Sequence, residues 1–358
     1  MYTHALTRAL LQADAAVTLY VHPANRFWDD LPVKRVLVED PESLEPALPA
    51  QRALIFAHTR MPPDMAQRLA ARHLLVGFAH NPMFEREPGW LRHCSHVVTV
   101  SRYCLELLRR AGVQRVYPAP LYGVAEARRG DASAPLLRSS PYWWDRRKAR
   151  DVLMEKFEPL ANIFSRAAFY EKRPGLTLGV VSMIAPIKQF PLLFSHLAPI
   201  LARHQVNLEV FGAGGYAQVR DTKAALAPLG ERARWWGHQK DVAAVYAGID
   251  YLLTGLPEKE ALGINALESQ ACGTPVLAPN APPFNETVIP GRTGFLYADP
   301  RTDRGADFDR LLVRLKQGPR PDPRRAVIHL SQFSQHALFE RVRRLLDELT
   351  RPVSPQPR

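Results

Sequence analysis

Short apolar runs alternate with amphipathic segments along the first third of the chain. The amphipathic segments 63–72 and 102–111 have helical spacing, and the second places Leu105, Leu108 and Ala111 on one side. The apolar runs predict β-strands at 16–20, 33–38, 53–57, 74–78, 96–100 and 113–117. Apolar strands that are separated by helices are typical of a parallel sheet covered on both faces.

The alternation is interrupted between residues 125 and 174 and then resumes. The interrupting segment contains Trp143, Trp144 and a basic helical stretch at 145–157. That stretch fits a surface helix and an interfacial membrane contact equally well. Further strands are predicted at 176–181, 207–211, 233–236, 251–254, 275–278 and 293–297, before an amphipathic helix at 335–349.

These patterns predict an α/β protein with two Rossmann-like domains, each a doubly wound parallel sheet. A chain of 358 residues is too long for one ordinary core and long enough for two. We expect a first domain at 1–174, with an inserted element at 125–174, and a second domain at 175–330. The C-terminal helix and Pro-rich tail at 331–358 are expected to cross back to the first domain.

Charge and cysteine content narrow the class of protein. The chain has 47 Lys and Arg against 35 Asp and Glu, and a net charge of +12 favours an anionic partner. With no ribonucleoprotein or zinc-finger motif, we do not expect nucleic acid to be that partner. Three cysteines without paired spacing argue against disulfides and a zinc site and fit a reducing cytoplasm. No signal peptide or membrane span is recognised.

The densest chemical signal lies between residues 258 and 295, which read EKEALGINALESQACGTPVLAPNAPPFNETVIPGRTGF. Gly263 lies in a tight loop after a strand, and the helix predicted at 265–272 follows it. Gly273 is placed as the left-handed C-cap of that helix. A helix N-terminus with free backbone N–H groups is suited to a diphosphate, and ligands bind at this edge of parallel sheets. Glu260 on the loop and Glu268 inside the helix suit hydroxyl groups on two different parts of one extended ligand.

This segment resembles the retaining glycosyltransferases of the GT-B architecture, family four (glycosyl transferases group 1). Their signature is a Glu, seven residues and a second Glu, then an Ala-Cys-Gly-Thr-Pro-Val-like run and a Gly-x-Thr-Gly turn. Here these are Glu260, Glu268, 271–276 and 291–294. The resemblance implies that Glu260 holds donor-sugar hydroxyls and Glu268 the ribose. It also implies that the backbone of Gly263, Ile264 and Asn265 faces the diphosphate.

Other parts of the chain carry the resemblance further. Residues 181–188 resemble the strand and loop where the family places an Arg and a Lys against the diphosphate; Lys188 is retained, but Met183 stands at the Arg position. Gly212 belongs to a glycine turn that resembles one lining the donor site. His58 and His80 each follow an apolar strand, as in the family's His-bearing loops. We favour a functional role for His80, which ends a strand, and a structural role for His58.

The start of the chain departs from the family pattern. The family opens with a strand and a glycine-rich loop, whereas residues 2–11 already resemble the helix that follows them. The first strand of the N-terminal domain is therefore expected to be missing.

The resemblance implies a cleft between two domains in which a hexosyl group passes from a nucleotide-diphosphate sugar, with retention, to a glycan or lipid-linked acceptor. Lys188 and the helix N-terminus would stabilise the leaving diphosphate, and His80 would help to position the sugar. No metal and no cofactor beyond the nucleotide-sugar co-substrate is expected. A role in polysaccharide or lipopolysaccharide synthesis on the cytoplasmic face of the inner membrane fits the positive charge.

Two alternatives of the same architecture stay open. A sugar-nucleotide epimerase would need acid and base groups around the sugar and no second substrate. A non-catalytic relative would bind a sugar nucleotide without turnover. The Met183 substitution and the missing strand are consistent with this alternative.

Overall fold

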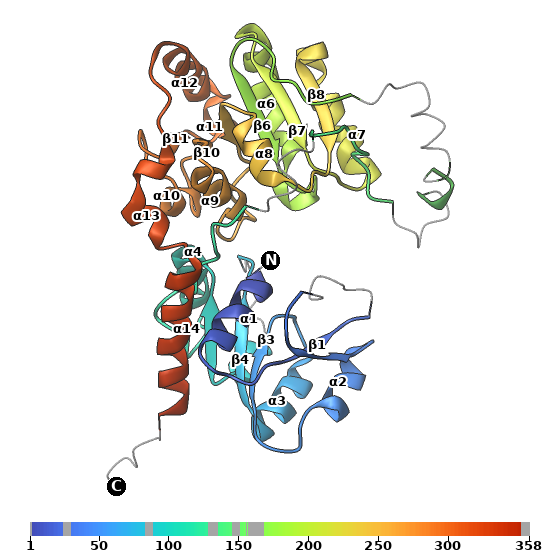
Figure 1. The fold of residues 1–358 in the computed structure, drawn as a ribbon, viewed down its shortest axis with the longest axis vertical. Coiled ribbons are helices and arrows are strands. Elements are labelled where there is room, and N and C mark those ends of the chain that lie inside the picture. Colours follow the sequence, from blue (N-terminus) through green and yellow to red (C-terminus); the bar gives the residue numbers. More distant parts are fainter. Residues whose placement is uncertain are drawn as a thin grey trace. The chain divides into compact units, whose positions relative to one another are not determined.

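The computed structural model describes residues 2–23, 30–82, 89–127, 135–144, 151–154, 156 and 168–351. The chain divides into two compact units, one of residues 1–124 with 331–358 and one of residues 125–330 (Figure 1). Most of the basic stretch predicted at 145–157 lies outside the described residues. Within the described ranges, no helix combines the length and the apolar character that crossing a membrane requires.

The first unit contains two small parallel sheets. One pairs β1 (Thr18–Val21) with β2 (Lys34–Leu37), and the other has the order β3-β4-β5. The elements of the second sheet and the helices around both are β3 (Leu54–Ala57), β4 (Leu74–Ala79), β5 (His96–Thr99), α1 (Tyr2–Gln12), α2 (Pro41–Ala47), α3 (Pro63–Arg72), η1 (Leu91–His93) and α4 (Arg102–Arg110). The C-terminal helix α14 (Gln335–Thr350) packs along α1 (Figure 1).

The strand predicted at 113–117 is wrong. Arg115 has a left-handed backbone (φ 57°), which interrupts the extended conformation, and only Val116 forms a bridge, to Val97 of β5. The segment nevertheless follows the edge of the sheet, because Val97 donates to the Arg115 carbonyl and Tyr117 donates to the Val97 carbonyl.

The second unit is built on a six-stranded parallel sheet with the order β11-β10-β9-β6-β7-β8. Its strands are β6 (Thr177–Val181), β7 (Asn207–Phe211), β8 (Ala233–Gly237), β9 (Tyr251–Leu253), β10 (Val276–Pro279) and β11 (Gly294–Tyr297). Between β6 and the C-terminal helix α14, the chain forms the helices η2 (Pro186–Lys188), α6 (Phe190–Arg203), α7 (Tyr216–Ala225), η3 (Ala227–Arg232), α8 (Val242–Ala247), α9 (Ile264–Ala271), α10 (Phe284–Thr287), α11 (Pro300–Asp303), α12 (Ala306–Gln317), η4 (Pro323–Arg325) and α13 (Val327–Ser331).

Helices cover both faces of this sheet, which explains why its strands are mostly apolar. Leu178, Val210 and Leu277 share one buried cluster with residues of α6 and α12. Phe211 and Val276, which point the opposite way, share another with residues of α8 and α9. Alternate positions of each strand therefore enter different cores, as a doubly wound sheet requires.

The strand order reverses direction at β6. The chain moves outward from β6 through β7 to β8, and then returns to place β9 on the other side of β6. In open parallel sheets a crevice forms at such a reversal, outside the carboxyl ends of the two strands. The loops after β6 and β9 therefore line the expected ligand position in this unit.

The described parts of segment 125–174 group with the second unit rather than with the first. Leu137 and Phe169 form an antiparallel bridge, and Ser139 donates to the Trp236 carbonyl at the end of β8. Trp143 donates in the same way to Gly214, just beyond β7. The unit boundary thus lies at residues 124 and 125, whereas the sequence pattern placed it at 174 and 175. Backbone pairing between residues distant in sequence, which local pattern does not show, holds this segment to the sheet edge.

Candidate functional site

Two loops meet at the carboxyl ends of β6 and β9, where the strand order reverses, and bring Lys188 and Glu260 together. Lys188 ends the short helix after β6, and Glu260 lies on the loop that follows β9. The Nζ atom of Lys188 donates to Oε2 of Glu260, and both side chains are largely buried, at 19% and 15% exposure. The sequence places these two residues 72 positions apart.

The backbone holds Lys188 in this position. Leu256, beyond β9, donates its N–H to the Lys188 carbonyl at 3.3 Å. A Cβ atom at Gly255 would lie 2.6 Å from the same oxygen, so only glycine allows this close approach. Gln189, with a left-handed backbone (φ 53°), then turns the chain into α6.

The carboxylate of Glu260 is also bound to its own loop. Its Oε1 accepts N–H groups from Ala261 at 3.2 Å and from Gly263 at 3.0 Å. Burial raises the pKa of Glu260, but the charge and hydrogen bond of Lys188 together with the two N–H groups outweigh it. The pKa therefore lies below its usual value, and the carboxylate is charged at neutral pH.

Gly263 forms the N-terminus of α9 with a left-handed backbone (φ 77°), which glycine adopts without strain. An added Cβ would lie 2.9 Å from the Phe284 ring. Asn265, in the first turn, donates through Nδ2 to the Val181 carbonyl at 3.1 Å and so ties α9 to the end of β6. Gly273 ends the helix with φ 84°, which confirms the predicted C-cap.

Glu268 lies one turn inside α9 and is separate from the Lys188–Glu260 pair. It is 5% exposed, and its Oε2 accepts the O–H of Tyr246 at 3.2 Å. Tyr246 on α8 is fully buried, and its own carbonyl accepts the Thr274 hydroxyl at 2.7 Å. The two carboxylates thus have different partners within the protein, and contact with two parts of one ligand stays a prediction. Sequence analysis did not identify Tyr246, whose apolar helical context carries no signal beyond a buried aromatic.

Gly212 lies at the carboxyl end of β7 and allows the loop after β6 to approach. A Cβ atom there would lie 1.8 Å from the Ser182 carbonyl, and the backbone has a φ of 152°. Its N–H donates to the Gly237 carbonyl at 2.7 Å. Met183, at the position where the resemblance places an arginine, is 44% exposed on this loop.

In the first unit, His80 and His58 form a pair at the carboxyl ends of β4 and β3. The Nδ1 atom of His58 lies 2.8 Å from Nε2 of His80, and Thr3 Oγ1 lies 3.4 Å from the same Nδ1. Phe78 stacks against both imidazoles. Burial lowers the pKa of His58 to about 3 and that of His80 to about 4, so both rings are neutral at pH 7. Any role of His80 therefore involves His58, its hydrogen-bond partner.

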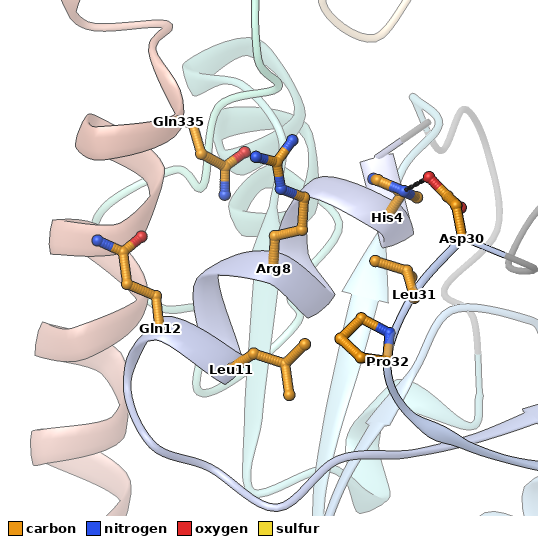
Figure 2. Close-up of a pocket in the computed structure, with 8 residues that line it drawn as sticks. All are labelled: His4, Arg8, Leu11, Gln12, Asp30, Leu31, Pro32 and Gln335. Atoms are coloured by element: carbon orange, nitrogen blue, oxygen red, sulfur yellow. Dashed lines mark hydrogen bonds and ion pairs between the residues drawn. The ribbon is translucent and has the colours of Figure 1, made fainter.

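The first unit also contains a cavity of about 450 Å³ beside α1, in the size range of small-molecule sites. Figure 2 shows Arg8 pointing toward Gln335 of α14, while His4 bonds to Asp30 at 2.9 Å. The remaining lining residues are Leu11, Gln12, Leu31 and Pro32. Arg8 has no carboxylate partner among the described residues. Across the described ranges, no three His, Cys, Asp or Glu side chains form a group that could hold a metal ion.

Comparison with known sequences finds a family model that matches part of the second unit. Residues 165–313 match the family described as Glycosyl transferases group 1. The D-inositol 3-phosphate glycosyltransferase of Mycobacterium leprae is 31% identical over 213 residues, which cover 56% of this chain and 49% of that protein. The enzyme of the same name from Frankia alni is 31% identical over 177 residues, covering 46% and 43%. The alignments thus span about half the length, or less, of these curated relatives.

Solved structures share the fold. A glycosyltransferase from Rickettsia africae has a TM-score of 0.66 and 13% identity, with 96% of this chain and 93% of that chain covered. HepE of Anabaena, in complex with UDP and glucose, has a TM-score of 0.63 and 18% identity, covering 96% and 94%. A sucrose-phosphate synthase from Thermosynechococcus elongatus has a TM-score of 0.64 and 16% identity, covering 97% and 92%. The chain therefore has the fold of these proteins, with two Rossmann-like units.

Proposed function

Residues 165–313 belong to the glycosyl transferases group 1 family, and on that premise we propose that this protein transfers a sugar from a nucleotide-diphosphate donor to an acceptor hydroxyl. The observation that carries the proposal is the meeting of Lys188 and Glu260 where the strand order reverses, beside the N-terminus of α9. A cation and the N–H groups of a helix N-terminus suit a diphosphate, and a carboxylate beside them suits sugar hydroxyls. HepE, which shares the fold, was solved with UDP and glucose, so UDP is the first nucleotide to test.

Each site residue takes one part of the donor in this proposal. Lys188 and the backbone of Gly263, Ile264 and Asn265 hold the diphosphate, and Glu260 accepts hydrogen bonds from the sugar. Glu268, one turn inside α9, holds the ribose. The tight packing of Gly212 on the loop after β6 keeps that loop close to the sheet.

The reaction we propose proceeds with retention. The bond between the anomeric carbon and the diphosphate oxygen breaks, and the acceptor oxygen forms the new bond on the same face of the sugar. The acceptor proton passes to a phosphate oxygen of the departing nucleotide. Negative charge grows on that diphosphate. Lys188 and the helix N-terminus stabilise this charge from the positions that they already occupy before the reaction. This assignment uses no metal ion.

We place the acceptor on the first unit. Its His58–His80 pair offers neutral imidazole groups at strand ends, which suit contacts to hydroxyls. The cavity beside α1 adds Arg8, a cation suited to an anionic group on the acceptor. A glycan or lipid-linked acceptor at an anionic membrane surface agrees with the net charge of +12. Sedimentation with phosphatidylserine and with phosphatidylcholine vesicles checks the membrane component, since only the anionic vesicles should carry the protein down.

Titration calorimetry with UDP, GDP, ADP and their sugar conjugates tests the donor site, and the donor that binds is then used for activity assays. Glu260→Ala should abolish most transfer, by roughly 100-fold or more, while nucleotide binding persists. Full activity in that variant would contradict the assignment of Glu260.

Met183 supports a second candidate, a non-catalytic protein that binds a nucleotide-sugar. It replaces a cation of the leaving-group pocket with a thioether that is 44% exposed. This candidate predicts donor binding without consumption of the donor, whereas an epimerase would convert the donor with no acceptor present. Analysis of products from donor alone, and from donor with acceptor, separates the three.

A further inference from the structure

Glu260 occupies two of the groups that the proposed function assigns to the diphosphate, Lys188 and the N–H of Gly263. Its Oε2 accepts from Lys188, and its Oε1 accepts from the Gly263 N–H at the start of α9. The cation and one N–H of the helix N-terminus are therefore both bonded to a carboxylate of the protein itself. A diphosphate can use these donors only if it takes them from Glu260 or shares them with it.

The backbones of Lys188 and Glu260 are both held in place. The backbone of Lys188 is fixed against Gly255 and Leu256, and the Glu260 N–H is bonded to the Pro257 carbonyl at 2.9 Å. The two side chains are mostly shielded from water, at 19% and 15% exposure. A Glu260 carboxylate that lost Lys188 and Gly263 would keep the Ala261 N–H but would remain partly buried beside an anion. That is unfavourable unless new donors replace the two that were lost.

We propose that Glu260 is a specificity-determining residue that makes this site prefer an intact nucleotide-sugar over the free nucleotide left after transfer. The inference rests on the proposed function. A nucleotide-sugar takes Lys188 and Gly263 for its diphosphate and returns sugar hydroxyls to Glu260, so the carboxylate keeps hydrogen-bond donors. A free nucleoside diphosphate takes the same hydrogen-bond donors but offers no sugar hydroxyls to Glu260 in exchange. The contact between Lys188 and Glu260 therefore weakens product binding selectively and favours product release.

Calorimetry with UDP and UDP-glucose tests the inference on the wild-type protein and on Glu260→Gln, with the GDP and ADP pairs as parallel arms. Wild type should bind the nucleotide-sugar more tightly than the free nucleotide. Glu260→Gln keeps the shape and removes the charge, so it should bind UDP roughly tenfold more tightly, while its affinity for UDP-glucose does not increase. The preference for donor over product then falls by roughly tenfold or more.

Glu258→Gln is the matched control, because Glu258 lies on the same loop but pairs with Arg301 and Gln189. It should leave both affinities within about twofold of wild type. Glu260→Ala also removes the charge, so its affinities for UDP and UDP-glucose provide a second test. Thermal unfolding checks that each variant is folded.

The outcomes separate the two proposals. Wild-type protein that binds no nucleotide and no nucleotide-sugar overturns the proposed function and this inference together. Wild-type binding of UDP-glucose with an unchanged preference in Glu260→Gln and Glu260→Ala overturns the inference alone. A wild type that prefers UDP to UDP-glucose does the same.

Discussion

His58 and His80 share one hydrogen bond, with 2.8 Å between Nδ1 of the first and Nε2 of the second. Both rings are neutral at pH 7, so one donates and the other accepts, and the tautomer of each ring is set by its partner. His58 follows β3 and His80 follows β4, and these strands are neighbours in a parallel sheet. A structural role for one histidine and a functional role for the other are therefore linked.

We expect His58→Ala to lower kcat/KM for transfer about as much as His80→Ala, by roughly tenfold, because either change leaves the other ring without its partner. The double variant should lose little more than either single variant. Kinetics on the three variants checks this, with His93→Ala as a control in the same unit. Additive losses would show that the two histidines act independently.

The same pair predicts how stability depends on pH. Burial lowers both pKa values in the folded protein, to about 3 and about 4, from the ordinary value of 6.5 that applies after unfolding. Below pH 6.5 the unfolded chain binds protons that the folded protein does not, so the free energy of unfolding falls as the pH drops toward 4. Above pH 6.5 the pair contributes no pH dependence. Urea unfolding at several pH values checks this, and a double variant with Asn at positions 58 and 80 should show a shallower dependence.

Lys188→Met should lower kcat by roughly 100-fold, because a neutral side chain of similar length cannot stabilise the charge on the leaving diphosphate. Affinity for the nucleotide should also fall, since we propose that the same cation holds the diphosphate before reaction. Lys259→Met is the matched control, because Lys259 is exposed on the neighbouring loop, and it should stay within about twofold of wild type. Equal activity of the two variants would remove Lys188 from the mechanism.

Tyr246→Phe tests how Glu268 is held. The Tyr246 O–H donates to Glu268 at 3.2 Å, so its loss weakens the hold on the carboxylate that we propose binds the ribose. UDP should bind roughly fivefold more weakly, whereas 2′-deoxy- and 3′-deoxy-UDP should change less. Tyr170→Phe removes a partly buried hydroxyl that donates to the Gly248 carbonyl, and it serves as the control. An equal loss for UDP and both deoxy nucleotides would indicate a purely structural role for Tyr246.

Gly212→Ala should destabilise the second unit by about 3 kcal/mol, because the new methyl group would meet the Ser182 carbonyl. Gly215→Ala, three residues later, is the control, since open space surrounds that position and its backbone is ordinary (φ −63°). Chemical unfolding of both variants measures the difference. A Gly212→Ala protein as stable as the control would mean that the loop after β6 can move aside freely.

The amino-acid sequence by itself determined the class of the fold and the position of the motif that contains Glu260 and Glu268. Apolar strands and amphipathic helices are local patterns, and most of the predicted strands match those in the structure to within two residues at each end. The left-handed cap at Gly273 is equally local, because it depends on one residue type at the end of one helix. For the same reason the sequence located the Glu260 loop and α9 without a structure.

Only the tertiary structure decided which groups meet. Lys188 reaches Glu260 because β9 pairs with β6 across the reversal of strand order, and no spacing along the chain encodes that contact. The same holds for Tyr246 against Glu268 and for segment 139–144 against the ends of β7 and β8. Periodicity reports which face of an element is buried, whereas partners across the sheet depend on crossovers that bring distant segments together. The chemistry proposed here therefore depends on long-range contacts that the motif alone does not specify.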